Sequence, residues 1–238
     1  MTHVETDRPQ KSATFYQIAS GARLPAGCVT SRDIVSARLL SFLLLAAGRA
    51  SAAESPAPAE PASWYASANF YLLEGEDDFL QPTAFVDHGR LHLEARYNYE
   101  DRDTGSIWAG YNLSAGDEFA LKFTPMLGAV VGSTAGIAPG YKASLSWRSL
   151  VLYSEAEYVV DTDGADDSFF YTWTELSVAP AEWWRAGLVI QRTKSYETEF
   201  EVQRGLLLGF HRGRLDFTAY VLNPDESPAY VLAVGAGF

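Results

Sequence analysis

The sequence contains almost no cysteine and few basic residues. Cys28 is the only cysteine among 238 residues, so an intrachain disulfide and a zinc site built from several thiolates are both excluded. The formal net charge is −12, and residues 54–238 alone carry 27 acidic and 12 basic side chains. With a single cysteine we expect no redox chemistry. Binding to nucleic acid requires clustered cations, so the acidic balance predicts no nucleic-acid partner.

A long apolar run is missing as well. The most apolar segment, residues 39–48 (LLSFLLLAAG), is too short to cross a bilayer as a helix. Arg32 and Arg38 precede it and the small residues of RASAAES follow it, which is the pattern of a secretory signal peptide. A buried core helix is the weaker alternative. We therefore predict a signal peptide over residues 1–53 with an over-extended N-terminus, and an unstructured Pro/Ala-rich linker over residues 54–66.

Helical periodicity is absent from the rest of the chain. In residues 91–100 (LHLEARYNYE), apolar and aromatic residues alternate with polar ones at every position. Period-two alternation is typical of a β-strand with two different faces. Residues 118–127, 150–160 and 215–221 repeat the pattern, and aromatic residues, which favour strands, make up 13% of the sequence. The sequence therefore predicts an all-β domain over residues 67–238.

The predicted strands are joined by connections of two kinds. Short polar turns at 88–90, 114–117, 147–149, 179–182 and 211–214 alternate with longer, more acidic loops at 74–78, 100–105, 131–136, 161–167, 194–199 and 223–227. This arrangement predicts about twelve antiparallel strands. Because the number is even, both ends of the domain are expected on the short-turn side.

Alternation alone leaves open which face points inward. In a soluble barrel or sandwich, the apolar face would fill the core. A closed barrel of about twelve strands is wider than a barrel of about eight, which side chains can fill, so an apolar interior would contain voids. If the apolar face contacts lipid instead, closure pairs every backbone group and the interior is polar. The polar residues predicted to line this lumen are His92, Glu94, Arg96, Lys122, Lys142, Glu155, Glu157, Glu175, Arg185 and Gln191.

Aromatic residues fall where the two membrane interfaces are then expected. They are Trp147, Trp183, Trp184, Phe210 and Phe238 near the short turns, and Tyr97, Tyr99, Tyr158 and Phe170 near the long loops.

With these features the chain resembles the outer-membrane β-barrel proteins of Gram-negative bacteria. The last residues, YVLAVGAGF, look like the C-terminal signal that the barrel assembly machinery reads in such proteins, formed here by Tyr230, Leu232, Val234 and Phe238. The resemblance implies a single antiparallel transmembrane β-barrel of porin-like type, with periplasmic N and C termini, in contact with outer-membrane lipid and lipopolysaccharide. It carries over no functional residues.

The sequence offers little for catalysis. His88 and His211 lie in predicted short turns, unlike the rim histidine of the omptin proteases, and nothing resembles the Ser/His arrangement of outer-membrane phospholipase. His92 beside Glu94 could act as a base, but a histidine in a hydrogen-bonded lumen network is the more common case. We therefore expect no enzyme activity and no cofactor.

The loop DTDGADD is the one weak candidate for a metal site. Its carboxylates, Asp161, Asp163, Asp166 and Asp167, suit Ca²⁺ or Mg²⁺, but Gly164 comes too early for the twelve-residue calcium loop, and a solvated acidic loop is favoured.

Three functions stay open at this point. The favoured one is a small channel or solute-binding barrel with a charged lumen and a small solute as partner. The second is a barrel with a closed lumen that acts in structure or adhesion through its acidic loops, and an outer-membrane hydrolase is a minor third.

Overall fold

The structure is a computed structural model, and it describes residues 61–74, 77–162, 167–195 and 201–238. The predicted signal peptide, most of the predicted linker, and Asp163 and Asp166 of the predicted metal loop lie outside these residues. Within the described ranges no helix is long and apolar enough to span a membrane.

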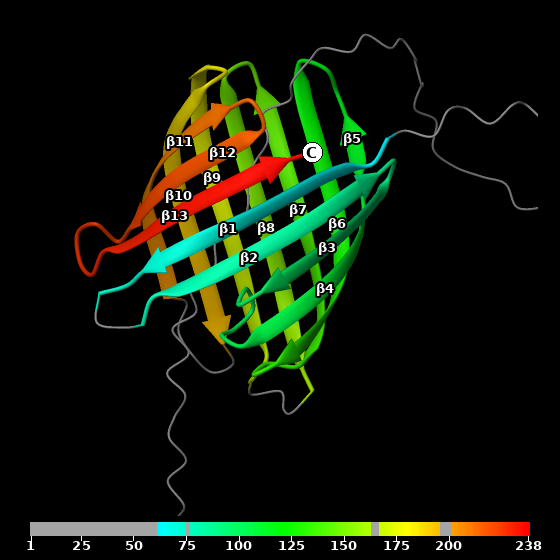
Figure 1. The fold of residues 1–238 in the computed structure, drawn as a ribbon, viewed down its shortest axis with the longest axis vertical. Helices are drawn as coiled ribbons and strands as arrows, with labels where there is room; N and C mark the ends of the chain where they lie inside the picture. The colour runs from blue at the N-terminus through cyan, green and yellow to red at the C-terminus, as the bar shows by residue number, and fades with distance from the viewer. Residues whose placement is uncertain (1–60, 75–76, 163–166, 196–200) are drawn as a thin grey trace, which may run out of the picture.

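The described chain forms one antiparallel sheet of thirteen strands (Figure 1). The strands are β1 (Ser63–Leu72), β2 (Phe79–His88), β3 (Leu91–Tyr97), β4 (Thr104–Tyr111), β5 (Leu113–Ala115), β6 (Phe119–Gly132), β7 (Gly136–Trp147), β8 (Leu150–Asp161), β9 (Phe169–Ala181), β10 (Trp184–Ser195), β11 (Glu201–Arg212), β12 (Leu215–Leu222) and β13 (Ala229–Gly237). Each strand pairs with its neighbours in sequence, except that β4 and β5 do not pair with each other, and β1 pairs with β13 and β4 with β6. These two pairings close the sheet, so the predicted all-β antiparallel barrel is confirmed.

The closing seam lies between the first and the last strand. The β1–β13 register runs from Tyr65 opposite Gly237 to Leu72 opposite Tyr230. Beyond it, the Phe238 amide donates to the Trp64 carbonyl at 2.8 Å, and the Trp64 amide donates to the Phe238 carbonyl at 3.2 Å. The ladder therefore continues to the last residue.

The count of thirteen comes from one interrupted strand. Strands β4 and β5 both pair with β6, one after the other, and only Asn112 separates them. The Asn112 side chain donates to Asp87 Oδ1 and accepts from Thr124 Oγ1, both at 2.7 Å. The barrel thus has twelve strands plus one short extra strand, β5, that continues the edge of β4.

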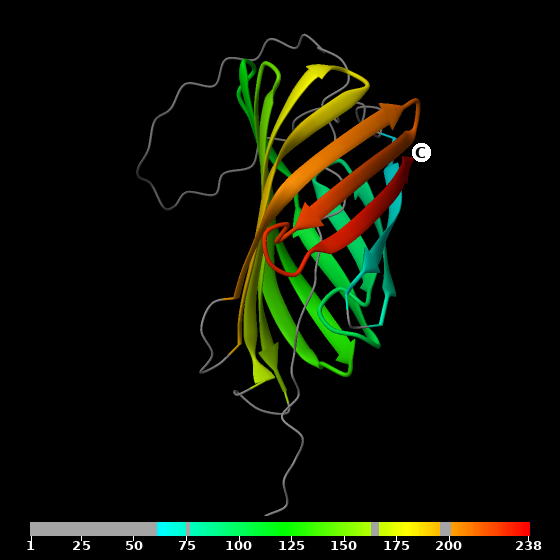
Figure 2. The same ribbon diagram turned by 90° about the vertical axis from the view of Figure 1, so that its left-hand side faces the viewer.

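The barrel is flattened. Figure 2 shows strands β6–β10 as one steep wall, and strands β1–β4 with β11–β13 as the wall that faces it. Short turns alternate with longer loops in the order that the sequence predicts, except that the loop predicted at 131–136 is only residues 133–135, because β6 extends to Gly132 and β7 begins at Gly136.

The two faces of the strands differ as the alternation predicts. In β3, exposed and buried residues alternate at every position. Large apolar side chains such as Leu188 and Leu206, which are 55% and 53% exposed, point outward. Carboxylates such as Glu94 and Glu175, which are 5% and 2% exposed, point inward. The outside of the barrel is therefore apolar, whereas the inside contains buried charges beside buried aromatic and aliphatic side chains such as Trp173 and Val189, and a soluble core would not hold so many charges.

Aromatic rings pack in pairs on the outer face near the short turns. Phe119 stacks on Trp147 at 5.4 Å between ring centroids, and Trp183 stacks on Phe210 at 6.3 Å. Such pairs suit a membrane interface, where the rings meet both apolar and polar surroundings.

One strand boundary and the position of one aromatic residue differ from the sequence-based prediction. Strand β1 begins at Ser63, so residues 63–66 belong to the barrel and not to the linker. Tyr99 was expected at the outer interface but is 2% exposed inside the barrel. The reason is Asn98, whose φ of 55° breaks the alternation after β3 and turns the next side chain inward.

Candidate lumen site

The residues predicted for the lumen lie mostly inside the barrel. Arg96, Glu155, Glu157 and the others in β3, β8, β9 and β10 are buried, and Lys142 in β7 is partly buried. Lys122 is different, because it is exposed to solvent. It lies where β6 pairs with the short strand β5, at the rim of the barrel, and it does not join the buried charges.

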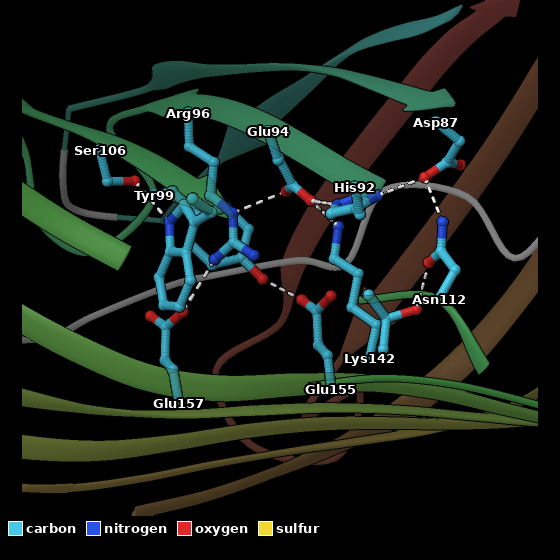
Figure 3. Close-up of polar contacts among 12 residues, drawn as sticks. Asp87, His92, Glu94, Arg96, Tyr99, Ser106, Asn112, Lys142, Glu155 and Glu157 are labelled. Atoms are coloured by element: carbon cyan, nitrogen blue, oxygen red, sulfur yellow. Dashed lines mark hydrogen bonds and ion pairs between the residues drawn. The ribbon is translucent and has the colours of Figure 1, made fainter. Parts of the chain in front are cut away.

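Most of these charges belong to one connected group that we call the Arg96 cluster. Its members are Asp87, His92, Glu94, Arg96, Tyr99, Lys142, Glu155 and Glu157, which Figure 3 labels, and Glu100, Trp108 and Tyr153. They come from strands β2, β3, β4, β7 and β8 and from the loop after β3. The cluster therefore links both walls of the flattened barrel.

Arg96 is the centre of this cluster. Its Nε donates to Glu94 Oε1 at 2.7 Å, and its Nη1 donates to Glu157 Oε2 at 2.8 Å, across from β3 to β8. The guanidinium carbon lies 4.1 Å from the centroid of the Tyr99 ring and 4.4 Å from that of Trp108. Ion pairs in the plane and rings on the faces are the contacts that suit a buried guanidinium.

Gly128 makes room for one of those rings. A Cβ atom at this position of β6 would lie 2.6 Å from the ring of Trp108, closer than such contacts occur. The glycine therefore allows Trp108 to lie flat against the neighbouring strand and under Arg96.

His92 lies between two carboxylates. Its Nδ1 is 2.7 Å from Asp87 Oδ1 and its Nε2 is 2.9 Å from Glu94 Oε2, and Lys142 Nζ contacts the same Glu94 oxygen (Figure 3). Both ring nitrogens thus face carboxylates, and neither points to a hydroxyl or thiol that it could activate. This geometry favours a structural histidine over the general base that we considered from the sequence.

The remaining acids of the cluster form a second layer. Glu155 accepts hydrogen bonds from the hydroxyls of Tyr99 and Tyr153, the latter at 2.6 Å. Glu100 accepts from Ser106 Oγ at 2.5 Å. Glu100 Oε2 and Glu157 Oε1 are buried and have no hydrogen-bond partner among the described residues.

A smaller group, the Arg185 cluster, lies on β9, β10 and β12 and consists of Trp173, Glu175, Arg185 and Tyr220. Arg185 Nη1 donates to Glu175 Oε2 at 2.6 Å. The other oxygen of Glu175 accepts from Trp173 Nε1 at 3.0 Å and from the Tyr220 hydroxyl at 2.8 Å. Every oxygen of this carboxylate is therefore paired.

Acids outnumber bases in the two clusters together. The acids are Asp87, Glu94, Glu100, Glu155, Glu157 and Glu175, and the bases are Arg96, Lys142, Arg185 and His92. Arg96, Lys142 and Arg185 each form an ion pair with a carboxylate of the same cluster.

Sequence reasoning missed several members of the clusters. Tyr99, which was assigned to the outer interface, lines the interior, and so do Trp108, Trp173 and Tyr220, to which the sequence assigned no place. In β9 the strand alternation could have predicted this placement, since Trp173 shares a face with Glu175. No group of three or more His, Cys, Asp or Glu within the described part of the chain could hold a metal ion.

The closed β-barrel, apolar outside and with charges inside, is the architecture of an outer-membrane barrel, and comparison with solved structures finds the same fold. The chain is similar to the KdgM porin, with a TM-score of 0.54 and 10% identity over 73% of this chain and 99% of that one. It is also similar to the NanC porin, with a TM-score of 0.52 and 10% identity over 73% of this chain and 98% of that one. The chain therefore has the fold of an outer-membrane porin.

A weaker similarity links the chain to the outer-membrane protein Omp33 of Acinetobacter baumannii, at 9% identity and a TM-score of 0.43. No protein-family model and no curated protein sequence matches the chain.

Proposed function

We propose that the protein is a narrow, non-enzymatic, porin-like channel in the outer membrane of a Gram-negative bacterium. The observation that carries this proposal is the distribution of charge: the outer face of the barrel is apolar, and the Arg96 and Arg185 clusters lie inside it. Buried charges are costly, and in membrane barrels they mark paths for ions or solutes.

The apolar outer face fits lipid on geometric grounds. Closure pairs each of the twelve barrel strands on both sides among the described residues, and only the three-residue β5 pairs on one side. Paired edges are the condition for backbone inside a bilayer. Rings at the short-turn end, such as Trp183 and Phe238, which are 60% and 66% exposed, fit one membrane interface. Outer-membrane lipid and lipopolysaccharide are therefore the partners that we assign to this face, and the barrel assembly machinery is the partner that we assign to the last strand.

Conductance in planar bilayers tests the proposal. The purified barrel should first show heat modifiability, migrating faster unheated than boiled on SDS gels. In symmetric KCl it should then open discrete conductance steps. A heat-modifiable barrel that never conducts would refute the channel.

That result would favour the second candidate, a barrel with a closed lumen that acts through its loops. The contacts from Arg96 to Glu157 and from Tyr99 to Glu155 support this alternative, because both join β3 or its following loop to β8 across the interior. Such bridges rigidify a barrel and narrow its lumen.

A further inference from the structure

The acid surplus in the lumen indicates which ions a channel of this kind would pass. This inference rests on the proposed channel function. In a low-dielectric passage the sign of the fixed charge sets the sign of the permeating ion.

The buried cations are already occupied by carboxylates. Arg96 contacts Glu94 and Glu157, Lys142 contacts Glu94, and Arg185 contacts Glu175. An anion entering the lumen would have to compete with these contacts, and it would meet the other carboxylates at close range. The lumen thus offers an anion few donors.

A cation meets the opposite situation. Glu100 Oε2 and Glu157 Oε1 are buried oxygens that have no hydrogen-bond partner among the described residues. Glu155 accepts hydrogen bonds from the neutral hydroxyls of Tyr99 and Tyr153. Faces of buried aromatic rings, such as those of Trp173 and Tyr220, also attract cations.

Charged residues at the two ends of the barrel add to the electrostatic potential that an entering ion meets. The loops and strand ends at the long-loop end carry, among their described residues, the base Arg102 and the acids Glu74, Asp77, Asp78, Asp101, Asp103, Asp161, Asp167, Asp225 and Glu226. The turns and strand ends at the short-turn end carry the bases Arg90, Arg148, Arg212 and Arg214 together with the acids Asp117, Glu118, Glu182 and Asp216, so the charges there balance. An acidic mouth raises the local concentration of cations before they enter.

We infer that the lumen selects small cations over anions, and that Glu155 and Glu157 are the residues that set this preference. This is the opposite of what a lumen for acidic solutes needs. The KdgM porin, which shares the fold, was solved in complex with oligogalacturonate, a polyanion. A shared fold therefore does not imply a shared solute.

The test is the reversal potential of the full barrel in a KCl gradient, measured after channels have been seen in symmetric KCl. The wild-type protein should show the sign of a K⁺-selective channel. Glu155→Gln and Glu157→Gln should each move the reversal potential toward zero, and the double variant should move it further. Glutamine keeps an oxygen that can accept the tyrosine hydrogen bonds of Glu155.

Glu182→Gln is the matched control. It removes the same charge from an exposed residue in the turn between β9 and β10, so the reversal potential should stay at the wild-type value. A wild-type channel that prefers Cl⁻, or that shows no preference, overturns the inference whatever the variants do. Equal shifts in the control and in Glu157→Gln would assign the selectivity to the overall charge and not to the lumen. The absence of any channel in symmetric KCl would refute the proposed function itself.

Discussion

Substitution of Leu188 by arginine tests the orientation of the whole barrel. Leu188 lies near the middle of β10, is 55% exposed on the outer face, and is flanked by Leu176 on β9 and Leu206 on β11. If this face contacts lipid at mid-depth, Leu188→Arg should lower the free energy of unfolding by about 2–4 kcal/mol. In a water-exposed position the same change would be nearly neutral.

Val202→Arg is the control at another depth. Val202 is 50% exposed on β11, and it pairs with Arg192, an exposed cation that the barrel already tolerates at this level. Near the interface the cost of arginine falls to about 0–1 kcal/mol. The two substitutions introduce the same side chain at similarly exposed positions. The difference between their free energies of unfolding therefore reports the effect of depth in the membrane.

The assay is reversible urea unfolding of the barrel in lipid vesicles, followed by tryptophan fluorescence and checked by heat modifiability. We expect the free energy of unfolding of Leu188→Arg to lie about 1–4 kcal/mol below that of Val202→Arg. Equal values for the two variants, or a neutral Leu188→Arg, would mean that the apolar face does not lie in lipid, and the lumen assignment would fail with it.

Three further predictions follow from the contacts described above. Arg96→Met leaves buried carboxylates unpaired and should cost about 3–5 kcal/mol by urea unfolding, whereas Arg204→Met, at an exposed pair, should cost nothing measurable. Gly128→Ala should displace the ring of Trp108 and change the near-UV circular dichroism, while Gly105→Ala, where a Cβ atom would meet its nearest neighbours at 3.8 and 3.9 Å, should leave that signal unchanged. Phe238→Ala should reduce the folded barrel in cells more than after refolding in detergent, and equal losses in both settings would contradict a role in assembly.

The alternation of apolar and polar residues along the strands predicted most of the fold. In β3 every side chain lies on the face that period two assigns, because the strand is regular from Leu91 to Tyr97. The prediction failed at Tyr99, because the positive φ of Asn98 resets the alternation and nothing in the local pattern marks that residue as a turn. The strand count was also affected by one residue, because Asn112 interrupts a single strand and divides it into β4 and β5.

The lumen site was predictable only in part. Alternation gives the face of a residue but not its height along the barrel, so Lys122 was assigned to the interior although it lies at the rim. Contacts across the lumen depend on register and on barrel shape. The pair between Arg96 and Glu157 joins residues 61 positions apart, and no short-range pattern contains that information. The place of Trp108 depends on a glycine on another strand, which sequence alternation treats as neutral.

The seam between β1 and β13 has a consequence for the order of folding. It joins Tyr65 to Gly237 and Leu72 to Tyr230, so it pairs the two ends of the barrel domain, while the other pairings except β4–β6 connect strands adjacent in sequence. Closing so long a loop has the largest entropic cost of any pairing in the sheet. The hairpins can therefore form early, and the seam closes last. Until it closes, both edge strands offer unpaired backbone groups to other chains, so the rate of this single step sets how long the protein is prone to aggregate.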